Sequence, residues 1–245
     1  PWFELVAVAA SPRSAGKTYE EAVGGRWKMK TPMPEAAKKL VVLNVNQVEE
    51  VAAQVDFVFS AVDMSKDEIR AIEEAYAKAE VPVVSNNSAH RWTPDVPMMV
   101  PELNPEHAEI IPYQRKRLGT KRGFIAVKPN CSIQSYTPAL HALREFEPTL
   151  VVATTYQAIS GAGKTFKDWP EMIDNVIPYI AGEEEKSEQE PLRIWGKIED
   201  GVIKKAEGPL ITTQCIRVPV EDGHTAAVFV NFKKKPTKEE IIDRW

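Results

Sequence analysis

The chain has 245 residues, of which 43% are hydrophobic and 27% charged, and its formal net charge is -4. This composition is typical of a globular protein that forms one large domain or two modest ones. The small negative charge gives no reason to expect nucleic acid or an anionic membrane as a partner. Its 2 cysteines lie far apart and no apolar run approaches the length of a membrane span, so we expect a cytoplasmic protein without a disulfide framework.

Apolar runs alternate with helical patterns through the first half of the chain. Strands are expected at 3–10, 40–45, 55–62 and 81–85, with helices at 48–55 and after Ser65. Ser65 and Glu68 fit a capping box that opens the second of these helices. The alternation predicts an α/β protein with a Rossmann-like parallel sheet covered on both faces. Ligands of such sheets bind beyond the carboxyl ends of the strands.

The turn after the first strand is a candidate phosphate site. Residues 11–18, like residues 158–165, miss a P-loop by one residue, because Ser11 and Ala158 replace its first glycine. A P-loop is therefore not favoured. In nucleotide-binding βαβ folds an acid after the second strand holds the ribose of NAD, whereas an arginine accommodates the 2′-phosphate of NADP. No acid follows here; the polar residues of the turn are Ser11, Arg13, Ser14 and Lys17, and they favour NADP over NAD. A solvated polar turn is the alternative.

Polar residues also follow the later strands, where a cofactor is expected to lie. They are Ser60, Asn86, Asn130 and Cys131. From 86 to 122 the chain is rich in proline and charge and is expected to be irregular. Arg91 is a candidate functional residue because it closely follows a strand end. His90 and His107 are expected at the surface or in loops, and the basic group 115–117 on a solvated face.

Cys131 lies where an apolar run at 123–127 gives way to helical spacing over 132–146. The partial positive charge of a helix N-terminus favours a thiolate, which makes Cys131 a candidate nucleophile; the alternative is a small core residue. Beyond it we expect a strand at 150–159, a helix around 172–180 and a strand pair at 211–220 and 226–232. Strand follows strand after Cys131, so we place a domain boundary there, between 1–130 and 131–245.

A cysteine nucleophile needs a proton donor or acceptor nearby, and histidine is the usual one near neutral pH. His224 follows a tight turn marked by Asp222 and Gly223, so we expect it to be exposed rather than buried. His141 is the competing partner, but it lies ten positions from Cys131, nearly three helical turns away. Cys215 falls inside an apolar strand and is expected in the core.

Seven segments in the same order resemble the aspartate-β-semialdehyde dehydrogenases, most closely the archaeal and fungal type. These segments are SPRSAGK at 11–17, SNNSAHR at 85–91, VPELN at 100–104, KPNCS at 128–132, QAISGAG at 157–163, IPYIAGEEEK at 177–186 and RVPVEDGHT at 217–225. The resemblance implies a Rossmann-like NADP-binding domain followed by an α+β catalytic and dimerisation domain. It further implies NADP-dependent interconversion of aspartyl-β-phosphate and aspartate-β-semialdehyde, with inorganic phosphate as co-substrate and a homodimer or homotetramer as the assembly.

The resemblance also assigns roles. Cys131 is expected to be the nucleophile, His224 the acid/base and Gln157 the residue that orients a thioester. Arg217 is expected to bind the α-carboxylate, and one glutamate of 183–185, preferably Glu183, the α-amino group. The remaining assignments are Arg91 and Asn130 on the phosphate side of the substrate, and Ser11, Arg13, Ser14, Lys17, Ser60, Asn86, Ser160 and Gly161 around NADP, with no metal site.

The sequence departs from the family at both ends. The glycine-rich turn that receives the pyrophosphate and the C-terminal portion of the cofactor domain are not among these 245 residues. We therefore expect an unpaired sheet edge beside the strand at 3–10, and weak NADP binding by a polypeptide confined to these residues. The alternatives are a related acyl-CoA reductase, such as malonyl-CoA reductase, and more distantly a P-loop phosphotransferase or a non-catalytic remnant.

Overall fold

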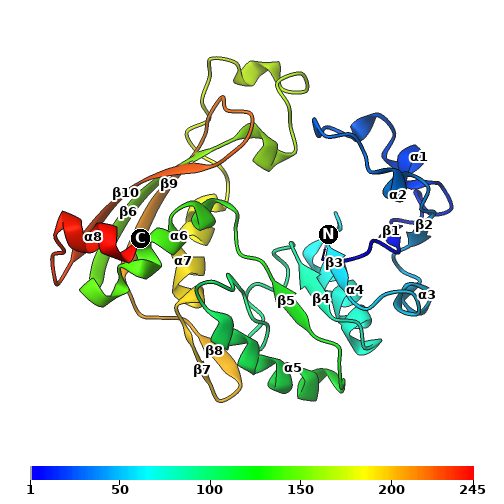
Figure 1. Ribbon diagram of the computed structural model, residues 1–245, viewed down its shortest axis with the longest axis horizontal. Helices are drawn as coiled ribbons and strands as arrows, with labels where there is room; N and C mark the ends of the chain where they lie inside the picture. The colour runs from blue at the N-terminus through cyan, green and yellow to red at the C-terminus, as the bar shows by residue number, and fades with distance from the viewer. Residues whose placement is uncertain (1) are drawn as a thin grey trace. The chain divides into compact units, whose positions relative to one another are not determined.

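The computed structural model describes residues 2–245 and divides the chain into two compact units (Figure 1). The first unit runs to Pro97 and includes Ile110–Lys128, and the second contains Met98–Glu109 and Pro129–Trp245. Along the part of the chain that is described, no helix is long and apolar enough to cross a membrane.

Parallel strands form the centre of the first unit, as the sequence predicted. The strands are β1 (Val8–Ala10), β2 (Val42–Asn44), β3 (Val58–Ser60), β4 (Val83–Ser85) and β5 (Ile125–Val127). The helices are α1 (Tyr19–Val23), α2 (Glu35–Lys38), α3 (Val48–Ala52), α4 (Lys66–Lys78) and α5 (Ile111–Leu118). The strands are shorter than expected and form two sheets, one of β1 and β2 and one in the order β3-β4-β5.

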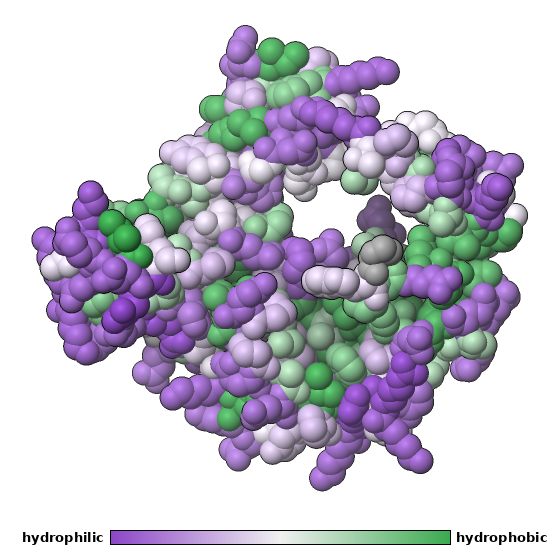
Figure 2. All heavy atoms as spheres, viewed as in Figure 1, coloured by the Kyte–Doolittle hydropathy of each residue, from purple (hydrophilic) through white to green (hydrophobic). Residues whose placement is uncertain are grey.

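An apolar cavity of about 700 Å³ is lined by residues from both β1 and β3. Phe3 and Phe57 pack edge to face in its wall, with ring centroids 4.9 Å apart. Among the described residues β1 pairs with β2 and β3 with β4, so each sheet has an open edge on this cavity. Figure 2 shows hydrophobic residues exposed in the region of β1 and β2. The sheet is thus open beside β1, as the sequence predicted.

Helix α4 anchors the carboxyl ends of β3 and β4. Its capping box is confirmed, because Ser65 Oγ accepts from the Glu68 N–H and Glu68 accepts from the Ser65 N–H. From the buried face of the helix, Glu73 accepts hydrogen bonds from the hydroxyls of Ser60 and Ser85, both at 2.6 Å. The two strand ends are therefore tied to one carboxylate.

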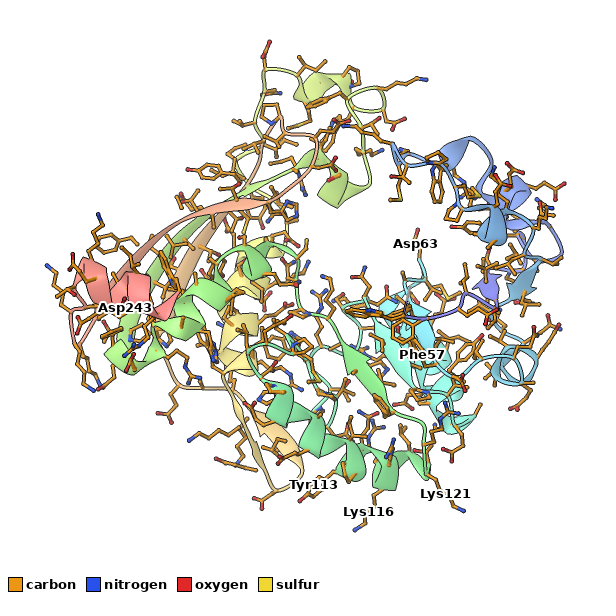
Figure 3. The ribbon with its side chains drawn as sticks, in the orientation of Figure 1. Phe57, Asp63, Tyr113, Lys116, Lys121 and Asp243 are labelled. Carbon is orange, nitrogen blue, oxygen red and sulfur yellow. The ribbon has the colours of Figure 1, made fainter. Side chains whose placement is uncertain are left out.

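The segment from 86 to 122 is not irregular, because it contains α5. The helix ends at Gly119, whose φ of 75° is left-handed and favours glycine. Buried Gln114 fixes the helix by donating to Ile125 O at 2.9 Å and accepting from Ile125 N–H at 2.6 Å. Tyr113 and Lys116 point away from the helix toward solvent (Figure 3). The charged outer face concealed the helix, since its buried residues are only Gln114 and Leu118.

A mixed sheet in the order β10-β6-β9 forms the second unit. Its strands are β6 (Pro148–Gln157), β9 (Leu210–Arg217) and β10 (Thr225–Phe232), with a separate hairpin of β7 (Lys197–Glu199) and β8 (Val202–Lys204). The helices are α6 (Thr137–Ala142), α7 (Glu183–Ile194) and α8 (Lys238–Arg244). Short 3-10 segments across both units are η1 (Gly24–Arg26), η2 (Pro105–Ile110), η3 (Ser132–Ser135), η4 (Arg144–Phe146), η5 (Ile159–Ala162) and η6 (Pro170–Met172).

Three predictions for this unit are wrong. The strands β9 and β10 do not pair with each other but flank β6, parallel and antiparallel respectively. No helix covers 172–180, because Ile177 forms a β-bridge with Arg217 and the apolar residues Ile173, Val176 and Tyr179 face solvent instead of a core. The expected helix at 132–146 is divided into η3, α6 and η4.

His90 and His107 are buried, with 1% and 0% exposure, contrary to the surface positions expected from sequence. His107 Nε2 lies 3.1 Å from Gly196 O and its Nδ1 lies 3.1 Å from Asn104 Nδ2. The Gly196 carbonyl only accepts, so Nε2 carries a proton, and the Asn104 amide nitrogen only donates, so Nδ1 carries none. His107 is therefore neutral. Burial lowers the pKa of His107, and the hydrogen bond to Gly196 opposes this only in part.

Stability should therefore depend on His107 at mildly acidic pH. Its folded pKa lies below the unfolded value of about 6.5, so the unfolded chain binds more protons as the pH falls. The stabilisation is complete above about pH 6.5 and is lost as the pH falls toward the folded pKa, by at most about 1.4 kcal/mol per pH unit. The free energy of unfolding can be measured with urea at several pH values. Below about pH 6.5 it should fall less steeply with falling pH for His107→Gln than for the unchanged chain.

The burial of His90 and His141 also lowers the pKa of each, so both contribute a slope of the same sign. They are present in both proteins, and the difference between the two slopes isolates His107. Identical slopes would show that His107 is not held neutral by the fold.

Candidate active site

Three predicted site residues lie at one edge of the β10-β6-β9 sheet. Gln157 ends β6 and Arg217 ends β9, and the two are partners in the parallel ladder. The antiparallel β10 begins at Thr225 opposite Tyr156, so His224 immediately before it reaches the same edge. The sheet topology thus gathers three polar side chains that lie far apart in sequence.

Cys131 lies in a turn that Asn130 holds in place. Asn130 Oδ1 accepts from the Ser132 N–H at 2.8 Å and from the Ser132 hydroxyl at 2.6 Å. The Asn130 N–H donates to Glu190 Oε2 at 2.6 Å. Asn130, Ser132 and Glu190 are buried whereas Cys131 is exposed, so a rigid turn presents the thiol to solvent.

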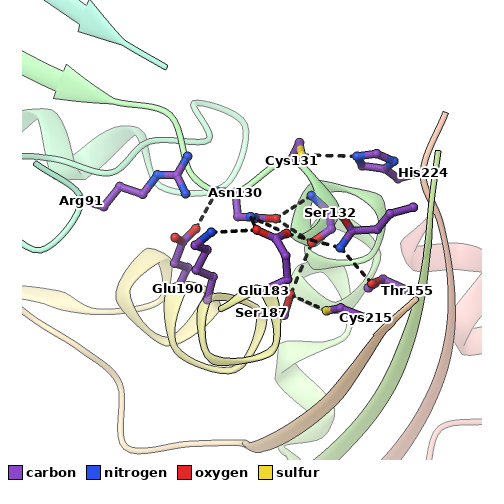
Figure 4. A network of polar contacts seen from close by, with 12 residues as sticks. Arg91, Asn130, Cys131, Ser132, Thr155, Glu183, Ser187, Glu190, Cys215 and His224 are labelled. Atoms are coloured by element: carbon purple, nitrogen blue, oxygen red, sulfur yellow. Dashed lines mark hydrogen bonds and ion pairs between the residues drawn. The ribbon is translucent and has the colours of Figure 1, made fainter. Parts of the chain in front are cut away.

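The thiol has a histidine partner. Cys131 Sγ lies 3.3 Å from His224 Nε2 (Figure 4). The other ring nitrogen, Nδ1, accepts the Ala158 N–H at 3.0 Å. The structure therefore brings His224 to the thiol, and the competing candidate His141 lies elsewhere, in α6. Cys215 is fully buried, as predicted, with its sulfur 3.5 Å from Ser187 Oγ.

Glu183, at the start of α7, is the centre of a polar network beside this pair (Figure 4). Its carboxylate accepts from Asn130 Nδ2 at 2.9 and 3.1 Å and from Gln157 Nε2 at 3.3 Å, and pairs with Lys186 Nζ at 2.8 Å. Burial alone would raise the pKa of Glu183, but the hydrogen bonds from Lys186 and Asn130 outweigh it and lower the pKa. A carboxylate is thus held ionised near the thiol.

Arg217 supplies the positive charge of the site. It is 7% exposed and donates from Nη1 to Ala158 O at 2.8 Å. Burial lowers the pKa of Arg217, while the nearby charges of Glu183 and Cys131 oppose that change. A guanidinium stays charged in proteins, so a cation and an anion lie within electrostatic range of one thiol. This arrangement can bind a small zwitterion and attack it with sulfur.

The predicted 2′-phosphate residues lie together on the turn after β1, in the first unit. The Ser14 N–H donates to Ser11 O at 2.9 Å, and the Val42 N–H donates to Lys17 O at 2.8 Å, which fastens the turn to β2. Arg13 and Lys17 are exposed. A fixed backbone thus presents two flexible cations, which suits a phosphate ligand.

The remaining candidates are divided between the two units. In the first, the Asn86 N–H donates to Ser60 O at 2.8 Å, while the Ser60 hydroxyl points inward to Glu73. Arg91 is buried there and donates from Nε to Lys128 O at 3.0 Å. Ser160 and Gly161 belong to η5 in the second unit.

Of the two P-loop near-misses only the first leads into a helix, and there the Thr18 hydroxyl already donates to Glu21. Thr18 caps α1 and its hydroxyl is engaged with Glu21, and α1 has 5 residues. After Lys164 and Thr165 the next helical segment is η6, at Pro170–Met172. A P-loop requires its lysine and hydroxyl residue at the start of a helix that follows the loop.

Sequence reasoning missed Glu190, Ser187 and the backbone of Ala158. Glu190 lies two helical turns after Glu183, so both face the cysteine turn from α7. That seven-residue spacing was a usable signal, but α7 itself was not predicted. The role of Ala158 had no sequence signal, because it is made by main-chain atoms.

Comparisons with known proteins agree with these observations. A model for the semialdehyde dehydrogenase NAD-binding domain matches residues 1–111, and one for the semialdehyde dehydrogenase dimerisation domain matches residues 139–244. Aspartate-semialdehyde dehydrogenase of Aspergillus fumigatus is 40% identical over 247 residues, covering 98% of this chain and 66% of the relative. The Archaeoglobus fulgidus enzyme of that name is 40% identical over 240 residues, covering 98% and 67%.

Solved structures give the same result. The aspartate-semialdehyde dehydrogenase of Candida albicans, solved with NADP, has a TM-score of 0.86 and 34% identity, covering 100% of this chain and 69% of that chain. Aspartate-semialdehyde dehydrogenase II of Vibrio cholerae, complexed with ASA, has a TM-score of 0.69 and 25% identity, covering 98% and 70%. The chain spans about two thirds of the length of the curated relatives it matches, 66%, 64% and 65% in three cases.

The Glu183 network makes a prediction about stability. Glu183→Gln replaces an acceptor-only group with an amide that must turn one donor toward Asn130, Gln157 or Lys186. We expect a loss of about 1–3 kcal/mol in the free energy of unfolding, measured by urea denaturation. The matched control is Glu185→Gln, which removes an exposed charge from the same helical turn and should change the free energy by less than about 0.5 kcal/mol. Equal effects would mean that helix electrostatics, not the network, matters.

Proposed function

Because the chain belongs to the aspartate-semialdehyde dehydrogenase family, we propose that the protein carries out the phosphorylating dehydrogenase reaction of that family. In the biosynthetic direction it reduces aspartyl-β-phosphate to aspartate-β-semialdehyde, and in the reverse direction it consumes inorganic phosphate. The observation that carries the proposal is the 3.3 Å contact between Cys131 Sγ and His224 Nε2, in the second unit with buried Arg217 and partly buried Glu183.

The residues divide the chemistry among them. The Cys131 thiolate attacks the acyl carbon, the carbon–oxygen bond to phosphate breaks, and a thioester on Cys131 forms as phosphate leaves. NADPH, when bound, supplies the hydride for reduction at this carbon. His224 Nε2 is placed to act as acid/base at the sulfur and at the oxygen beside it. Breaking the carbon–sulfur bond then releases the aldehyde and restores the thiolate.

The charges of the site match the substrate. Arg217 offers a planar fork to the α-carboxylate, and Glu183 offers a carboxylate to the α-ammonium group. Gln157, whose amide already reaches Glu183, orients the thioester. Arg91 and Asn130 are assigned to the phosphate side, and the Asn130 amide also positions Glu183. An acyl-CoA substrate would bring no ammonium group to Glu183, and the named relatives give no support to that alternative or to a phosphotransferase.

NADP suits the exposed basic turn of the first unit. Arg13 and Lys17 would hold the 2′-phosphate, with the hydroxyls of Ser11 and Ser14 as further donors. The other assigned contacts are Ser60, Asn86, Ser160 and Gly161. We assign residues 1–130 to the NADP-binding domain and 131–245 to the catalytic and dimerisation domain, of a cytoplasmic homodimer or homotetramer.

The nucleophile can be tested by a matched pair of cysteine variants. Cys131→Ser should lower phosphate-dependent NADP reduction with aspartate-β-semialdehyde by roughly a thousandfold or more, because a serine hydroxyl is scarcely ionised near neutral pH. Cys215→Ser changes the other, buried cysteine and should retain most activity. An essential Cys215 together with a dispensable Cys131 would refute the assignment.

Cofactor choice gives a second test. Replacing Arg13 and Lys17 together by glutamine should weaken NADP by tenfold or more, because charge-assisted hydrogen bonds of roughly 1.5–3 kcal/mol each are lost. The affinity for NAD, which has no 2′-phosphate, should change little. Titration of both cofactors gives the comparison, and an equal loss for both would remove these residues from the 2′-phosphate site.

A further inference from the structure

The short turn η5, which follows β6, holds two side chains of the site through the backbone of Ala158. The Ala158 N–H donates to His224 Nδ1 at 3.0 Å, and the Ala158 carbonyl accepts from Arg217 Nη1 at 2.8 Å. The same carbonyl also accepts the Gly161 N–H at 3.1 Å, which closes the turn. Ala158 is completely buried, so water does not compete for these bonds. The turn that orients the histidine and the arginine therefore also brings Gly161 against them.

Backbone hydrogen bonds fix this turn to the segment that leads to His224. The Ile159 N–H donates to Val220 O at 2.9 Å, and the Ser160 N–H donates to Glu221 O at 3.2 Å. Neither the turn nor the segment before His224 can move away from the other without breaking these bonds. The space between Gly161 and the imidazole is therefore set by the backbone.

Position 161 requires glycine for space and not for backbone conformation. Gly163, two residues later, has a left-handed φ of 66°, whereas the φ of Gly161 lies outside that region. A Cβ atom at Gly161 would lie 2.7 Å from His224 Cε1, 3.0 Å from His224 Nε2 and 3.1 Å from Arg217 Nη1. An alanine at this position can adopt the backbone conformation, but it forces the imidazole or the guanidinium to move.

We propose that Gly161 is a positioning residue for the reaction, because its missing side chain lets His224 reach Cys131 and lets Arg217 keep its place in the site. His224 Nε2, the acid/base atom, lies 3.3 Å from Cys131 Sγ, and a displaced ring loses this contact. The inference rests on the proposed function. It adds a role in the chemical step to the cofactor contact assigned to Gly161 above.

The variant Gly161→Ala separates this role from cofactor binding. Gly161 is exposed and its φ suits alanine, so the variant should fold, which far-UV circular dichroism checks. The matched control is Ala162→Ser, which also adds one heavy atom to an exposed residue of the same turn. Ala162 has no assigned role in the site.

A positioning role predicts that Gly161→Ala lowers kcat at saturating NADP by roughly tenfold to a hundredfold in the phosphate-dependent oxidation of aspartate-β-semialdehyde, since a misplacement of about 1 Å has effects of this size. The KM for the semialdehyde should rise as well, because Arg217 is also displaced. The affinity for NADP, measured by titration, should change little, and Ala162→Ser should match the unchanged protein. A loss of NADP affinity with an unchanged kcat would overturn the proposal and leave Gly161 as a cofactor contact only.

A measurement without substrate or cofactor distinguishes failure of this proposal from failure of the proposed function. The proton NMR signal of the Cε1–H group reports the surroundings of each histidine ring. There are 4 histidines, and His224 is identified by the signal missing from His224→Gln. This signal should shift in Gly161→Ala and stay in place in Ala162→Ser. An unmoved signal in Gly161→Ala would overturn the proposal even in an active enzyme, whereas a folded chain without dehydrogenase activity would contradict the proposed function and leave the NMR result to decide the position of the ring.

Discussion

The site depends on one feature of strand pairing, the position of β6 between parallel β9 and antiparallel β10. Because β6 and β9 run the same way, Gln157 and Arg217 end at the same edge of the sheet. Because β10 runs the other way, it begins there, and His224 precedes its first residue. Had β9 and β10 formed a hairpin with each other, as the sequence indicated, β6 and Gln157 would not lie between Arg217 and His224. The topology therefore creates the site before any side-chain contact is considered.

Beside this sheet edge a partly buried carboxylate, Glu183, determines the charge of the site. Glu183 is surrounded by donors from three elements: the cysteine turn, the end of β6 and its own helix. Those hydrogen bonds outweigh the desolvation that would otherwise neutralise it, so its pKa is lowered. The negative charge in turn favours the guanidinium form of Arg217 against burial. The substrate recognition proposed for Glu183 and the stability of the site thus rely on the same contacts, and we expect a change at Glu183 to affect both.

Features that depend on local sequence were predictable, and those that depend on long-range contacts were not. The capping box at Ser65 and the buried strand around Cys215 follow from local pattern. Helix α5 was missed because one of its two buried residues, Gln114, is polar. His107 looked like a loop residue because its partners, Asn104 and Gly196, come together only in the fold. Pairing of Cys131 with His224 was suggested by chemistry and by family resemblance; no spacing rule required it.

The chemistry of the thiol and the choice of cofactor depend on residues of different units. Cys131, its histidine partner and the peptide of Ala158 all belong to the second unit, so the geometry of the pair is set by contacts within that unit. Arg13 and Lys17 belong to the first unit, which carries the basic turn. Changes in one set should leave the property governed by the other intact. The main-chain N–H of Ala158 orients His224 and is removed only by substitution with proline, whereas at Gly161 an added methyl group would contact the ring.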